Sequence, residues 1–123
     1  MKFSEELNSA HYHITGYGDA WVAVNQNTLS SSFLVDSQTL ISDWQPQSLQ
    51  DLQPAHLEPL FALGAEVILI GTGQTQQFPA PEIWKALVQH GVGFEVMTTA
   101  AACRTYNVLL SEARRVAAAF FLT

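Results

Sequence analysis

Apolar and polar positions follow two different periods in the second half of the chain, and these periods predict strands and helices in turn. Residues 67–70 are apolar at every position, which is typical of a strand buried on both faces. Pro81–His90 instead has apolar residues at helical spacing, with Gly91 as a stop signal. Gly93–Met97 is a second strand. A strand, a helix and a strand within about 30 residues predict a parallel pair with a right-handed crossover.

A second helix is predicted directly after this second strand. Thr98 or Thr99 can cap it, and it runs through the alanines to about Ser111. Residues 114–122 are then apolar on both faces, and we interpret them as another interior strand. Because the junction before them is short, we expect this strand to return antiparallel to the strands that end at Ile70 and Met97.

The first half of the chain has β-branched and aromatic runs separated by turn formers, a pattern that favours antiparallel hairpins. Prolines punctuate residues 44–63, which we interpret as a connector with at most short helices. The chain is therefore predicted to be an α/β domain with a mixed central sheet, two helices and an N-terminal antiparallel β-rich part. The expected strands of the first half cover residues 11–15, 21–24, 28–35 and 39–41.

Length and composition narrow the class of protein. With 123 residues, 48% of them hydrophobic and 13% charged, the chain fits one compact domain, residues 1–123, that is a monomer or a small homo-oligomer. A net charge of -6 argues against binding to a nucleic acid backbone. The single cysteine suits a reducing compartment. The first residues lack the apolar core of a signal peptide and no apolar run spans a bilayer, so we expect a cytoplasmic protein without membrane insertion.

The predicted order of elements indicates a crevice at one edge of the central sheet. The two parallel strands lead into Gly71–Thr72–Gly73 and into Thr98 and Thr99 at the same edge of the sheet, and an antiparallel final strand would begin there with Arg114 and Arg115. Ligands of open α/β sheets commonly bind outside the carboxyl ends of the strands, where helix N-termini favour anions. An anionic small molecule is therefore one candidate ligand.

A group of polar side chains near this edge has two interpretations. The group could be a preorganised anion site, with arginine as a planar donor and Asn107 as a positioned amide. Alternatively it is architectural, with Glu112 paired to an arginine and Asn107 bonded to the Gly71 loop. The candidate ligand-binding residues are Gly71, Thr72, Gly73, Thr98, Arg104, Thr105, Asn107, Glu112 and Arg115.

Three other signals are weaker. The two glycines of Gly71–Thr72–Gly73 do not complete the dinucleotide-binding fingerprint, because the third glycine of that fingerprint would fall at Gln76. The remaining interpretations of this loop are a plain tight turn and an anion-binding loop. Cys103 is near a helix start but has no histidine placed to activate it, so we expect a buried, unreactive thiol. His11 and His13 share one strand face, yet two ligands do not make a metal site. We expect neither metal nor cofactor.

The motif around Thr98, Ala101, Cys103–Asn107, Glu112 and Arg115, together with Gly71–Thr72–Gly73, resembles a family of small uncharacterised α/β domains. That family includes an adipogenesis-associated protein and a mitochondrial respiratory complex I assembly factor. The resemblance spans roughly residues 14–122 and implies a three-layer α/β fold with a mixed sheet. Ala113 departs from it, because bacterial relatives often have glycine there.

The resemblance brings no established catalytic activity. It implies a non-catalytic accessory or assembly protein that acts through contacts with a protein partner. The alternative is a small-molecule enzyme or sensor that uses the predicted crevice. Catalysis needs a nucleophile, a base or a metal in register, and the sequence assigns none of these, so whether the chain is an enzyme stays open.

Overall fold

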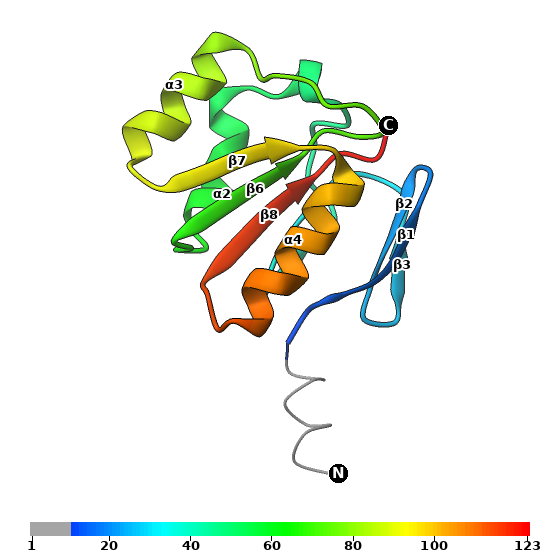
Figure 1. Ribbon diagram of the computed structural model, residues 1–123. Helices are drawn as coiled ribbons and strands as arrows, with labels where there is room; N and C mark the ends of the chain where they lie inside the picture. The colour runs from blue at the N-terminus through cyan, green and yellow to red at the C-terminus, as the bar shows by residue number, and fades with distance from the viewer. Residues whose placement is uncertain (1–10) are drawn as a thin grey trace.

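A five-stranded mixed sheet forms the centre of the molecule in the computed structural model, which describes residues 11–123 (Figure 1). The strand order is β5-β4-β8-β6-β7; β4 is antiparallel to β5 and β8, whereas β6 is parallel to β7 and β8. The strands are β4 (Phe33–Asp36), β5 (Leu40–Ile41), β6 (Val67–Gly71), β7 (Gly93–Met97) and β8 (Val116–Phe120).

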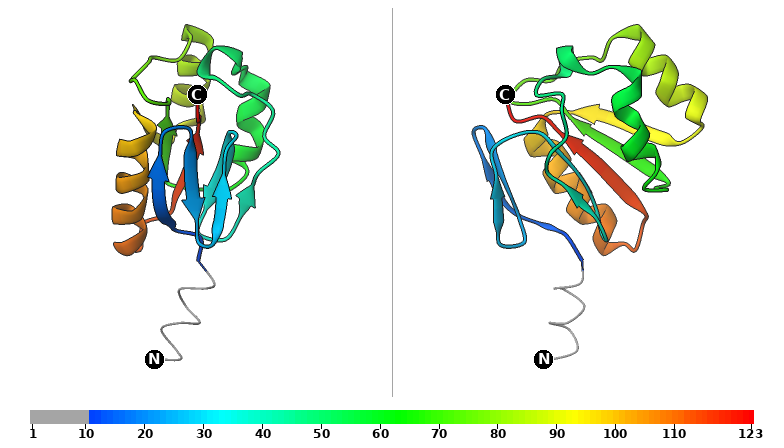
Figure 2. Two further views of the ribbon diagram at one scale, coloured as in Figure 1. Left: turned by 90° about the vertical axis from the view of Figure 1, so that its right-hand side faces the viewer. Right: turned by 180° about the vertical axis from the view of Figure 1, so that it is seen from behind.

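A second, antiparallel sheet and one long helix cover the same face of the central sheet (Figure 2). The sheet has the order β1-β2-β3, and the helix α4 lies beside β1 and packs on the strands β6 and β8. Apolar side chains of the small sheet and α4 meet the central sheet in one core. The elements of this layer are β1 (Ile14–Gly18), β2 (Trp21–Val24), β3 (Asn27–Leu29) and α4 (Thr99–Ser111).

The opposite face is covered by the connector and a second helix. Their leucines form a second core with alternate residues of β6 and β8 and with Phe121, so the fold has three layers around the mixed sheet. This confirms the predicted fold class, with one addition: the connector contains a short helix of its own. The elements are the 3₁₀ turns η1 (Leu49–Asp51) and η2 (Pro54–Leu57), and the helices α2 (Glu58–Phe61) and α3 (Pro81–His90).

Local signals predicted both long helices correctly. α3 has the predicted bounds and ends at Gly91 in the left-handed conformation, with φ 80°. α4 begins after Thr98, whose hydroxyl accepts a hydrogen bond from the Ala101 N–H at 3.2 Å.

The predicted strand over residues 28–35 is wrong in one respect, because it is two strands in different sheets. At the break, the buried Ser32 hydroxyl donates to the Pro46 carbonyl, which holds the chain as it crosses between sheets.

The predicted direction of the last strand is wrong. β8 lies inside the sheet as expected, but it is parallel to β6, with Val67 opposite Val116 and Gly71 opposite Phe120. The reason is that α4 itself reverses the chain: 13 residues of helix carry it about 20 Å back along the sheet before β8 begins. The short junction therefore starts β8 at the amino ends of β6 and β7.

The turn between α4 and β8 contains a strained residue. Ala113 has φ 61°, a left-handed conformation that is unfavourable for residues with a Cβ atom. We expect Ala113→Gly to raise the free energy of unfolding by about 0.5 to 1 kcal/mol, measured by urea denaturation. The control is Ala86→Gly in α3, which should lower it by about 1 kcal/mol. A destabilised Ala113→Gly protein would contradict this account of the turn.

Two sequence-based expectations concern a signal peptide and membrane-spanning segments. The expectation that the chain lacks a signal peptide concerns residues 1–10, which lie outside the described residues. From residue 11 onward, no helix has the length and apolar character that crossing a membrane requires.

Candidate functional site

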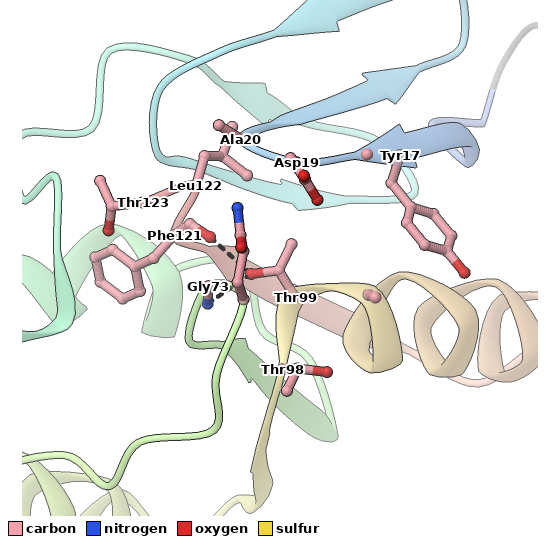
Figure 3. Close-up of a pocket in the computed structure, with 12 residues that line it drawn as sticks. Tyr17, Asp19, Ala20, Gly73, Thr98, Thr99, Phe121, Leu122 and Thr123 are labelled. Atoms are coloured by element: carbon pink, nitrogen blue, oxygen red, sulfur yellow. Dashed lines mark hydrogen bonds between the residues drawn. The ribbon is translucent and has the colours of Figure 1, made fainter.

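A pocket of about 320 Å³ opens at the carboxyl edge of β6, β7 and β8 (Figure 3). Its walls come from the tip of the β1–β2 hairpin, the first turn of α4, the loop after β6 and the segment after β8. This is the edge at which the sequence predicted a crevice. The lining residues are Tyr17, Gly18, Asp19, Ala20, Gly73, Gln74, Thr98, Thr99, Ala100, Phe121, Leu122 and Thr123.

Thr99 ties three of these walls together. Its hydroxyl donates to the Phe121 carbonyl at 2.6 Å and accepts from the Gly73 N–H at 2.9 Å, and its own N–H donates to the Gly73 carbonyl at 2.9 Å (Figure 3). Thr72 is also buried, and its hydroxyl donates to the Thr75 carbonyl at 2.8 Å. Both hydroxyls therefore hold the loop after β6 in place.

The two glycines of this loop are required by close packing. A Cβ atom on Gly71 would lie 3.0 Å from both the Phe120 ring and the Thr99 backbone. Gly73 has φ 101°, and a Cβ atom there would collide with the carbonyl of Thr123. These contacts account for both glycines without a ligand.

Arg115 and Glu112 do not belong to this pocket. Because β8 is parallel to β6, they lie at the amino ends of the strands, and at 3.3 Å per residue Arg115 is about 16 Å from Phe120 at the carboxyl edge. The Arg115 guanidinium donates to the Gly64 carbonyl at 3.2 Å, and Glu112 is the exposed C-cap of α4. The Arg115 N–H and the side chain of Arg114, 3.1 Å away, hold the pKa of Glu66 below its usual value.

The remaining candidates lie along α4. Asn107 makes two hydrogen bonds to Ile14 of β1: its oxygen accepts from the N–H at 2.9 Å and its amide donates to the carbonyl at 2.8 Å. It thus has an architectural partner, although this is β1 rather than the predicted Gly71 loop. Arg104 donates to the Tyr17 hydroxyl at 2.9 Å, which brings it beside the pocket, and Thr105 is half-buried on the same helix.

Sequence reasoning missed the hairpin side of the pocket. Residues 16–19 were expected only to form a turn between two strands, Ala20 was not singled out, and nothing local signals that this turn faces the start of α4. Figure 3 shows Asp19 and Tyr17 across from Thr98 and Thr99. The lining offers hydroxyl groups and the Asp19 carboxylate, with no histidine, cysteine or lysine, so it suits hydrogen bonding to a small polar ligand better than nucleophilic chemistry.

Cys103 is buried on the apolar side of α4, as predicted. Burial raises the pKa of its thiol to about 12, although the nearby Arg104 charge opposes the change. We expect thiol reagents at pH 8 to modify the native protein at least ~100-fold more slowly than the denatured protein, because reaction requires opening of the core. The rate with a chromogenic disulfide, with and without denaturant, tests this. A rapidly modified native thiol would contradict it.

His11 and His13 do not lie on one strand, contrary to the expectation from the sequence. β1 begins at Ile14, so His11 and His13 precede it, and the His13 ring lies 3.3 Å from the His11 carbonyl. Asp19, which could have supplied a third ligand, follows the far end of β1. Within residues 11–123, no group of three or more histidine, cysteine or acidic residues is arranged to hold a metal ion.

Comparison with known proteins adds a family. The model of a family described as "Protein of unknown function (DUF498/DUF598)" matches residues 14–121. The solution structure of a Xanthomonas campestris protein has 44% sequence identity and a TM-score of 0.82, and the match covers 90% of this chain and 84% of that one.

Two curated relatives have names that mention a membrane or an assembly process. A protein of Francisella tularensis named "13 kDa major membrane protein" is 35% identical over 85 residues, 68% of this chain and 69% of that protein. A Xenopus tropicalis protein named assembly factor 3 of the NADH dehydrogenase 1 alpha subcomplex is 38% identical over 81 residues. That match covers 64% of this chain but only 44% of the frog protein.

Proposed function

Because the chain belongs to the DUF498/DUF598 family of proteins of unknown function, we propose that it is a non-catalytic accessory or assembly protein that acts through contacts with a partner protein. The frog relative is named as an assembly factor, which supports this class of function. The match spans less than half of that relative's length, so the relative supports only the general class of function.

One observation carries the proposal: the polar groups best suited to a site are engaged within the fold. Thr99 bonds the ends of β6 and β8, Asn107 bonds both backbone groups of Ile14, and Arg115 bonds the Gly64 carbonyl. Thr99 in particular bonds buried backbone groups, and it cannot turn to a substrate without leaving those groups unpaired. These polar groups, at both ends of the central sheet and along α4, therefore support the fold.

The proposal is tested by reconstitution. Proteins that co-purify with the tagged chain from its own cells would be identified, expressed separately and mixed with it, and the complex measured by calorimetry and sedimentation. We expect a complex of defined stoichiometry. The chain should also show no shift of its melting temperature with phosphate, nucleotides or carboxylic acids, whereas a ligand at about 100 times its Kd stabilises by about 2.7 kcal/mol.

A small-molecule function is the second candidate, and the 320 Å³ pocket favours it. Ala100 lines this pocket from α4, so Ala100→Phe should fill it and abolish any thermal shift that a metabolite causes in the wild type. The control is Val108→Phe, which adds the same ring on an exposed part of α4, about 12 Å further along the helix. A metabolite shift lost only in Ala100→Phe would replace the accessory role with ligand binding.

We also propose a cytoplasmic location and a monomeric or small homo-oligomeric state. Composition, charge and the single cysteine support these assignments. Sedimentation velocity and cell fractionation test them.

A further inference from the structure

β7 is an edge strand of the central sheet. One of its sides pairs with β6 over its whole length, from Gly93 to Met97. Among residues 11–123, no strand pairs with its other side, and Figure 1 shows β7 at the border of the sheet. An open edge of this kind presents unpaired N–H and C=O groups to which another chain can add as a strand.

The hydrogen bonds identify which groups face outward. The Met97 carbonyl accepts from Thr72 N–H at 2.8 Å, on the β6 side. Because successive residues of a strand direct their backbone groups to opposite sides, those of Phe94 and Val96 face outward. The Gln76 side chain donates to the Val96 carbonyl at 3.3 Å, which agrees with this assignment, and an added strand would replace this exposed side-chain bond.

The two faces of β7 differ at this edge. On the α3 side, the Phe94 ring contacts Trp84 edge-on, with centroids 5.0 Å apart, and Trp84 is 45% exposed. Val88, one turn further along α3, is 56% exposed. On the α4 side, Glu95 is exposed, because α4 packs mainly on β6 and β8. A strand added at β7 would thus find an apolar surface on one face and a carboxylate on the other.

We propose that the outer edge of β7 binds an extended segment of a partner protein, which adds as an antiparallel strand beside Phe94 and Val96 and carries a lysine or arginine opposite Glu95. The proposal rests on the protein-binding function proposed above and names its surface. The residue opposite Glu95 would sit in a pair without mutual backbone hydrogen bonds, where side chains are closest.

Charge decides between a partner and a second copy of this chain. Two β7 strands paired about Glu95 would place like carboxylates against each other in a protein of net charge -6. A basic segment instead gains an ion pair, and it covers Trp84 and Phe94 with its apolar residues.

The test uses a capped peptide of alternating lysine and valine as the probe, and one of alternating glutamate and valine as its control. Amide hydrogen exchange of the chain is followed by NMR. We expect the lysine peptide at millimolar concentration to slow exchange of the Phe94 and Val96 amides at least ~10-fold. Glu95→Lys should reverse the preference between the two peptides, each affinity changing by at least about threefold.

A backbone variant separates edge binding from other contacts. Val96→Pro removes an outward N–H that takes no part in the β6 ladder, so it should abolish peptide binding while the β6–β7 amides stay protected. No slowing of the two amides by the lysine peptide, or slowing that grows with protein concentration without peptide, would overturn the proposal. A reconstituted partner complex that survives Glu95→Lys and Val96→Pro would overturn this surface alone and leave the accessory function intact.

Discussion

Replacing Phe120 with alanine is expected to lower the free energy of unfolding by about 3 to 5 kcal/mol, which is a large fraction of the total stability of a domain of this size. Phe120 is fully buried in β8, between the strands β4 and β6. Its ring lies 5.1 Å from that of Phe33 and 6.5 Å from that of Tyr106, measured between centroids. The truncation would thus open a cavity between the central sheet and α4.

Urea denaturation followed by tryptophan fluorescence and by circular dichroism measures this effect. Phe78→Ala is the matched control, because Phe78 is 75% exposed and its loss should change stability by no more than about 0.5 kcal/mol. Equal effects of the two substitutions would show that the packing around Phe120 does not determine stability.

Replacing Thr99 with valine is also expected to have a large effect and to lower the free energy of unfolding by about 2 to 4 kcal/mol. Valine keeps the volume but removes the hydroxyl, so the buried Gly73 N–H and Phe121 carbonyl both lose a partner. A buried polar group left unpaired costs about 1 to 3 kcal/mol. The loop after β6 and the end of β8 should therefore exchange amide hydrogens faster, which NMR can detect.

Two further variants isolate the cause. Thr99→Ser keeps the hydroxyl and should retain most of the stability. Thr98→Val removes only the N-cap bond of α4 and should cost about 1 kcal/mol. If Thr99→Val proved no worse than Thr98→Val, the hydroxyl of Thr99 would have no special part in joining β6 to β8.

The amino-acid sequence by itself determined the elements whose signals are local. Pro81 and Gly91 bound α3 because proline suits a first helical turn and glycine adopts the left-handed conformation that ends a helix. Thr98 similarly marks the start of α4. Continuous apolar runs identified β6 and β8 as interior strands, since a strand covered on both faces has no polar side.

Only the tertiary structure decided which residues meet. The direction of β8 depends on where α4 delivers the chain, and this moved Arg115 to the edge opposite Gly73. The bonds of Asn107 to Ile14 join residues 93 positions apart, and those of Thr99 likewise bridge distant segments. Such contacts leave no periodic or capping signal, because each is set by the packing of whole layers rather than by neighbouring residues. The sequence therefore located an edge of the sheet for the site, whereas the packing of the β1–β2 hairpin against α4 decided which side chains form the pocket.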